Sequence, residues 1–252
     1  MQGGIDALDR SSLPAADNIN PYAFSIAVNG ELIIQKGKMI AYYGNLKFEA
    51  LTQSAFASFV KTHFNSPMYA GDFVIVTGQG QLILGDRGFD INSYNIEAGN
   101  LTVRAANLLG YGGDLQLKQS IIPGYVALIG TGIMIAASHG AVHFIEPPCR
   151  VDPQALLGWA DAPSPCHHYD YQYVQGLMGA LGSAMGRSSG EEHQLDFVGA
   201  GTVLMQSSET MVSDGKLLQV LDGQSATLSL PGMQQLHQRI GARIQQQQSS
   251  QY

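Results

Sequence analysis

The 252-residue chain has little of what extracellular and nucleic-acid-binding proteins carry. Its two cysteines, Cys149 and Cys166, are too few for a disulfide framework, so we expect free thiols and a reducing compartment. Charged residues make up only 13% of the chain, and 13 Lys and Arg face 20 Asp and Glu, for a net charge of -7. Nonspecific nucleic-acid binding requires a basic face that releases counterions, so this composition argues against a nucleic-acid partner.

Catalytic signatures are also missing. The chain has no Cys-X-X-Cys pair and no His-X-His with a downstream Glu, and its Gly-X-Gly runs lack the third glycine of a dinucleotide site. We therefore predict no enzyme activity, no catalytic residues and no cofactor. Metal ligation has only weak candidates, because their spacing does not match a known zinc pattern: His139, His143, His167 and His168.

The chain also lacks a recognisable signal or membrane-spanning segment. Residues 1–10 contain acidic side chains and no apolar stretch, which favours a cytoplasmic location. Residues 120–145 contain no Asp, Glu, Lys or Arg and are long enough to span a bilayer. Pro123 and several glycines interrupt this stretch, however, so buried strands are the better interpretation and no transmembrane span is expected.

What the chain does contain is repetition. Three apolar segments, 73–84, 125–135 and 195–205, each carry a central Gly-X-Gly, which we interpret as a turn whose glycines need positive φ. A second recurring element ends in an aromatic residue, which places Tyr43, Tyr111 and Trp159 at equivalent positions. Runs that alternate apolar and polar residues follow each of these.

These patterns predict an all-β fold made of three antiparallel repeats. The expected domain spans residues 23–209, with repeats at about 23–88, 89–138 and 139–209. Each repeat has an apolar face that it can bury only against the others, so packing about a pseudo-threefold axis is expected. Residues 1–22 are predicted to be a flexible segment.

Two appended segments could bind a partner. The insert 176–190 is rich in Gly and Met, and the extension 210–252 contains a predicted amphipathic helix at about 231–246, followed by a polar tail. The predicted interaction residues are the large apolar side chains of these two segments: Leu177, Met178, Leu181, Met185, Met233, Leu236, Ile240 and Ile244.

Three stretches resemble a known family. Residues 35–42 (QKGKMIAY), 151–159 (VDPQALLGW) and 199–209 (GAGTVLMQSSE), together with the repeated glycine strands, are similar to the mitochondrial-biogenesis family named for altered inheritance of mitochondria, member twenty-four. The resemblance covers about residues 23–209. It implies a β fold like that of the tryptophan-RNA-binding attenuation protein, with no catalytic residues to carry over. The chain departs from the family at Gly190-Glu-Glu-His193, where Gly-Glu-Gly is usual.

The sequence thus favours a non-enzymatic β scaffold that binds a protein partner or itself, with a membrane surface as a further contact. One alternative is a β barrel that binds a small molecule in a pocket lined by Trp159, Tyr169, Tyr171 and Tyr173. The other is a metal-dependent enzyme of the cupin type.

Overall fold

The computed structural model describes residues 10–50, 72–120, 122, 124–161, 164–169 and 193–209. The paired strands in these ranges run antiparallel, and the helical elements among them are two 3-10 turns, η1 (Arg10–Ser12) and η3 (Ala105–Asn107). The all-β prediction is confirmed. The strands are β1 (Ala16–Asn20), β2 (Ala23–Gln35), β3 (Met39–Ala50), β4 (Phe73–Leu84), β5 (Asp90–Arg104), β6 (Leu108–Gln119), β7 (Tyr125–Ser138), β8 (Val142–Ile145), β9 (Cys149–Val151), β10 (Leu156–Asp161), β11 (Ser164–Tyr169), β12 (His193–Val198) and β13 (Gly201–Gln206).

The chain divides into two compact units by its internal contacts. Unit 1 contains residues 1–100, 105–119 and 126–141, and unit 2 contains residues 101–104, 120–125 and 142–252. The sequence predicts instead one domain of three repeats. The division falls within the second repeat because the last residues of β5, Leu101 to Val103, pair with β10 of unit 2.

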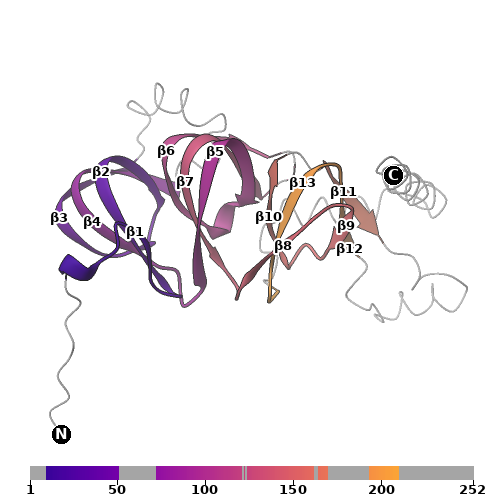
Figure 1. Cartoon of the computed structure of the whole chain (residues 1–252), viewed down its shortest axis with the longest axis horizontal. Helices are drawn as coiled ribbons and strands as arrows, with labels where there is room; N and C mark the ends of the chain where they lie inside the picture. Colours follow the sequence, from indigo (N-terminus) through magenta and orange to yellow (C-terminus); the bar gives the residue numbers. More distant parts are fainter. Residues whose placement is uncertain are drawn as a thin grey trace, which may run out of the picture. The chain divides into compact units, whose positions relative to one another are not determined.

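In unit 1 the strands follow the order β3-β4-β2-β6-β7-β5, with β1 on β2. Figure 1 shows β2, β3 and β4 as long, curved neighbours. Apolar side chains alternate along these strands and meet in one core, because period-two spacing puts every second residue on the same face. That core contains Phe24, Ile26, Val28, Leu32, Ile34, Leu46, Val76, Leu82, Leu84, Ile91, Leu109, Ile135 and Ala137.

Unit 2 has two groups of strands. The end of β5 is followed by β10, β13 and β8, and a separate three-stranded sheet has the order β11-β12-β9. Both groups contribute to one core, in which the rings of Tyr125 and Phe197 lie 5.2 and 5.6 Å from the ring of Trp159.

The Gly-X-Gly segments are not turns in the first two copies, contrary to the sequence interpretation. β4 and β7 run straight through them, with residues 74–84 of β4 paired with β3 and residues 126–136 of β7 paired with β6. The glycines permit close approach of backbones. A Cβ on Gly80 would lie 2.1 Å from the carbonyl oxygen of Tyr43, and a Cβ on Gly132 would lie 2.1 Å from that of Gly112. Only the third copy is interrupted, between β12 and β13.

The strand register identifies equivalent residues in the three copies. Gly44 pairs with Gly80, Gly113 with Gly132 and Asp161 with Gly201, and all of Gly44, Gly113 and Asp161 have positive φ (90, 85 and 65°). Each of the strands β3, β6 and β10 also has an irregularity at its first residue. Counting back from these pairs places Tyr42 with Tyr111 and Trp159. The predicted equivalence of Tyr43 is therefore wrong by one residue.

The ends of the chain are described only in part. Within the segment 1–22 that the sequence predicts to be flexible, residues 16–20 form β1, which pairs with β2. The predicted helix at 231–246 and the insert 176–190 lie outside the described residues. No helix within the described ranges is long and apolar enough to cross a bilayer. The arrangement of the three copies about an axis stays a prediction.

Candidate functional site

The first residues of β3 form an exposed apolar surface. Met39, Ile40 and Tyr42 are 39, 59 and 45% exposed, and β3 is the edge strand of its sheet among the described strands. We call residues 39–43 the β3 edge. An exposed apolar strand at a sheet edge is a template for pairing with another strand, and natural proteins usually cover or charge such edges. It is therefore a candidate binding surface.

The equivalent residues in the other two copies are buried. By register, Met39, Ile40 and Tyr42 correspond to Leu108, Leu109 and Tyr111 and to Leu156, Leu157 and Trp159, none of which is more than 5% exposed. The β3 edge thus carries large apolar side chains like those of a buried segment, but these side chains are exposed.

Strand pairing accounts for the difference. Tyr111 of β6 lies opposite Ile33 of β2, and Trp159 of β10 lies opposite Thr102 of β5. In both places, the end of a strand from one copy covers the aromatic segment of the next. We call these two places the β2–β6 joint and the β5–β10 joint. No described strand covers the β3 edge in the same way.

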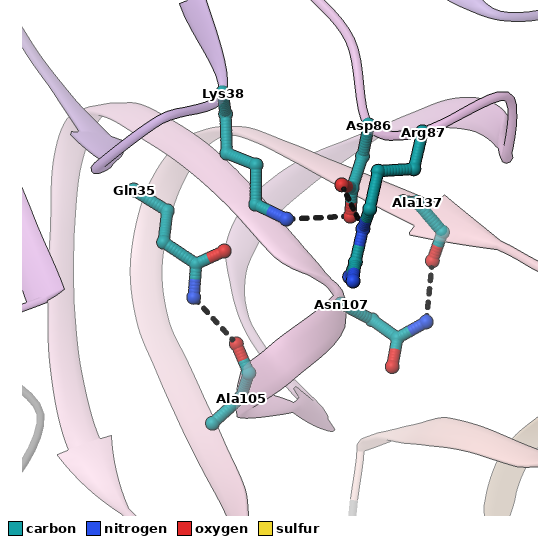
Figure 2. A network of polar contacts seen from close by, with 7 residues as sticks. All are labelled: Gln35, Lys38, Asp86, Arg87, Ala105, Asn107 and Ala137. Carbon is teal, nitrogen blue, oxygen red and sulfur yellow. Dashed lines mark hydrogen bonds and ion pairs between the residues drawn. The ribbon is translucent and has the colours of Figure 1, made fainter. Parts of the chain in front are cut away.

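A polar network holds the start of β3 in place. The Lys38 ammonium lies 2.5 Å from the buried Asp86 carboxylate, whose other oxygen lies 3.1 Å from Arg87 Nε (Figure 2). The backbone N–H of Gly85 also donates to the Lys38 carbonyl at 2.9 Å. These contacts tie the chain just before Met39 to the end of β4, so the exposed apolar side chains stand on a fixed strand.

The same network contains a contact that recurs at both joints. The Gln35 amide donates to the carbonyl of Ala105 at 3.4 Å (Figure 2). At the equivalent position of the next copy, the Arg104 guanidinium donates to the carbonyls of Pro153 and Leu156, the latter at 2.8 Å. The last residue of the covering strand, β2 or β5, therefore reaches the next copy's backbone at each joint.

The candidate metal histidines are described only in part. His139 packs on the ring of Phe89 in unit 1, and His143 of β8 in unit 2 lies 3.4 Å from the Ser207 hydroxyl. His167 and His168 belong to β11, and their side chains lie outside the description. Within the described part of the chain, no group of three or more His, Cys, Asp or Glu is arranged to hold a metal.

Cys149, on β9, is a free thiol. Burial and, to a smaller extent, the negative charge of Asp196 raise its pKa. Because the thiolate is the reactive form, a raised pKa keeps the thiol neutral and slow at pH 7.

We expect slow alkylation of Cys149 by iodoacetamide in dilute protein carrying Cys166→Ser. The rate should rise with pH beyond the ordinary thiol range of about 8.5. Asp196→Asn should accelerate the reaction at pH 8, because it removes the charge that opposes thiolate formation. Mass spectrometry of timed samples measures both rates, with the urea-unfolded chain as reference. Rapid alkylation of the folded chain at pH 6 would contradict the expectation.

The residues predicted to line a ligand pocket are only partly described. Trp159 is buried in the core of unit 2, where it packs on Tyr125 and Phe197. The side chain of Tyr169, together with Tyr171 and Tyr173, lies outside the description. So do all eight predicted interaction residues of the insert and the C-terminal helix.

Sequence reasoning missed the β3 edge, although the signal was present. Aligning the copies by the glycine pairs puts Met39-Ile40 with Leu108-Leu109 and Leu156-Leu157. Three apolar pairs at one repeat position suggest a shared buried role. What the sequence does not reveal is that no described strand covers this segment of the first copy.

The comparisons with known proteins agree with this architecture. A Streptococcus pyogenes protein, solved by X-ray crystallography as a structural-genomics target, is 19% identical, and the match covers 84% of this chain and 98% of that one, with a TM-score of 0.56. This similarity shows a common fold. A search of the curated proteins gives no match. The model of the family described as mitochondrial biogenesis AIM24 matches residues 25–208. The chain therefore belongs to the mitochondrial biogenesis AIM24 family.

Proposed function

We propose that this protein is a non-enzymatic β scaffold that binds other protein chains through the β3 edge. The observation that carries this proposal is the contrast between Met39, Ile40 and Tyr42 and their equivalents, which are 5% exposed or less. A partner strand laid along β3 would add backbone hydrogen bonds and cover the apolar side chains, which is the usual mode of strand addition to a sheet edge.

The apolar side chains provide a driving force for such binding. Fully burying a large apolar side chain stabilises by about 1.5–3 kcal/mol relative to leaving it exposed. Met39, Ile40 and Tyr42 are partly covered already, so each contributes less than that. Orienting two chains and ordering side chains opposes this gain. A reversible interaction is therefore expected.

The described polar groups support a structural role over a catalytic one. Asp86 is neutralised by Lys38 and Arg87, and Arg104 donates to backbone carbonyls and stacks on the Tyr125 ring. Each of these charged groups has a partner within the chain, so no substrate is needed to explain the burial of Asp86 and Arg104.

The test is a comparison of three immobilised chains. Ile40→Lys combined with Tyr42→Lys places two charges on the β3 edge, and Ile129→Lys places one on a similarly exposed apolar residue of β7, away from that edge. We expect wild type and Ile129→Lys to retain the same protein chains in similar amounts. The amount retained by the double variant should be at least tenfold lower, as measured by quantitative mass spectrometry. Equal recovery by all three would refute the β3 edge as the binding surface.

A further inference from the structure

We propose that the β3 edge binds a second copy of this chain, and that the strand it receives is β9 of that copy. This inference rests on the proposed function and names the partner. Copies would then join head to tail, with the β3 edge of one molecule covered by β9 of the next.

The first step is that β9 is the third-copy equivalent of the two covering strands. Cys149, Arg150 and Val151 pair with Phe197, Asp196 and Leu195 of β12. In the first copy, Leu32, Ile33 and Ile34 pair in the same way with Val76, Ile75 and Val74 of β4. Counting back from Leu156 and Leu108, β9 likewise corresponds to Leu101 to Val103 of β5.

The second step is that β9 has an open side. It is the last strand in the order β11-β12-β9 among the described strands. Its equivalents in β2 and β5 each pair on the corresponding side with the aromatic segment of the following copy. The Arg150 side chain is 40% exposed, whereas its equivalents Ile33 and Thr102 are 5% exposed. The chain therefore carries both halves of a third joint, the β3 edge and β9, and each has an outer side with which no described strand pairs.

Side-chain size indicates that these two halves fit each other. At the β2–β6 joint Leu32 lies opposite Gly112, and a Cβ on Gly112 would lie 3.0 Å from Leu32 Cδ1. At the β5–β10 joint Leu101 lies opposite Ala160. Both joints thus combine a large side chain on the covering strand with a small residue on the covered one. At the proposed joint the order is reversed, with Cys149 opposite Tyr43.

Charge points the same way. At the centre of the proposed joint, Tyr42 would lie opposite Arg150. The equivalent pairs at the two observed joints are Tyr111 with Ile33 and Trp159 with Thr102. A guanidinium over an aromatic ring is an attractive contact. Asp152 is the equivalent of Gln35 and Arg104, which donate to the carbonyls of Ala105 and Pro153. The residue equivalent to Ala105 and Pro153 in the first copy is Lys36. Asp152 would therefore meet Lys36 at the proposed joint. The proposed joint thus places opposite charges together.

One residue makes this joint weaker than the other two. Ala41 stands where β6 and β10 have Gly110 and Gly158, and a Cβ at those glycines would lie 2.8 and 2.1 Å from the carbonyl oxygens of the covering strand. The second copy must therefore sit slightly farther from β3 at this point. We expect the association to be reversible and to depend on concentration.

The two halves differ, so the contact is heterologous. A β3 edge bound to β9 leaves a free β9 at one end of the pair and a free β3 edge at the other, so further copies can add and form open chains or closed rings. A symmetric β3 to β3 contact would stop at dimers.

A disulfide tests the register directly. Opposite residues in antiparallel strands have Cα atoms about 4.5–5.5 Å apart, which lies within disulfide range. Tyr43→Cys in a Cys166→Ser background should therefore cross-link to the native Cys149 of another molecule during prolonged mild oxidation at alkaline pH, where the raised pKa of Cys149 slows the reaction least. We expect dimers, trimers and larger species on a non-reducing gel, and their loss after reduction. Lys47→Cys, on the same strand but beyond the joint, is the matched control and should give no more than background.

Three outcomes would overturn the proposal. Cross-linking that survives Cys149→Ser would show a β3 to β3 contact. A disulfide confined to monomers would show that the joint closes within one chain. No cross-link in a variant that melts like wild type would show that β9 is not the partner; if the β3 edge variant still loses bound proteins, the proposed function stands with a different partner. Should Tyr43→Cys fail to fold, sedimentation velocity over a range of protein concentrations is the second test. The mass of wild type should rise with concentration and the mass of Ile40→Lys should not. A wild-type mass that stays that of a monomer would overturn the proposal.

Discussion

Replacing Gly80 by Ala should destabilise the protein by about 3 kcal/mol or more, an unusually large effect for one methyl group. The added Cβ would lie 2.1 Å from the carbonyl oxygen of Tyr43 and 3.0 Å from Leu46 Cγ. Because the first of these atoms belongs to the backbone of the paired strand, β3 and β4 must separate. Gly132→Ala should behave in the same way, since its Cβ would meet the carbonyl of Gly112 at 2.1 Å.

Gly99→Ala is the matched control for these variants. Gly99 is also a strand glycine without positive φ, but an added Cβ would make only ordinary contacts, at 3.6 Å to Ile96 Cγ2 and 3.7 Å to the Glu97 carbonyl. We expect its stability to stay within about 0.5 kcal/mol of wild type. Urea unfolding followed by circular dichroism measures all three. Equal stability of Gly80→Ala and Gly99→Ala would mean that the close approach of β3 and β4 is not required.

The second large effect on stability is expected at the aromatic position that the copies share. Substitution by Ala should be strongly destabilising in the third copy and nearly neutral in the first. Trp159→Ala should cost about 3–5 kcal/mol, because the indole is 5% exposed and packs on Tyr125 and Phe197. Tyr42→Ala removes an equivalent aromatic ring that is 45% exposed. In dilute protein it should change stability by about 1 kcal/mol or less.

Tyr111→Ala completes the series and should resemble Trp159→Ala, since Tyr111 is 1% exposed. Unfolding midpoints in urea, taken at one low protein concentration, provide the comparison. If Tyr42→Ala were as destabilising as the other two, the β3 edge would be covered within the single chain, and the binding role assigned to it would be lost.

Sequence patterns predicted the strands well because they depend on local chemistry. The period-two alternation in residues 46–50 and 115–118 and the apolar runs at 73–84 and 125–135 all fall in observed strands. The role of the glycines was predicted only in part: Gly78, Gly130 and Gly201 have the expected positive φ, but β4 and β7 do not turn at their glycines. A glycine in a strand can serve a turn or a close backbone approach, and only the partner strand, here β3 or β6, decides between them.

The candidate site was harder to predict because burial depends on tertiary context. Tyr42, Tyr111 and Trp159 are all aromatic residues in apolar segments, so nothing local distinguishes the exposed one. The difference arises from which strand pairs beside each ring, and the residues opposite Tyr111 and Trp159, Ile33 of β2 and Thr102 of β5, lie 78 and 57 residues earlier in the chain. No described strand pairs with the β3 edge on that side, and such long-range pairing cannot be predicted from the residues of the edge itself.

The most direct test of the β3 edge as a binding surface is amide hydrogen exchange at two protein concentrations. Peptides that cover residues 39–43 and 149–151 are compared in wild-type protein at about 1 μM and about 500 μM, a range that brackets weak to moderate association. The account predicts that exchange slows in both segments together at the higher concentration, and that Ile40→Lys combined with Tyr42→Lys abolishes the slowing in both. Exchange rates in residues 39–43 that are fast and equal at both concentrations, in wild type and variant alike, would contradict it.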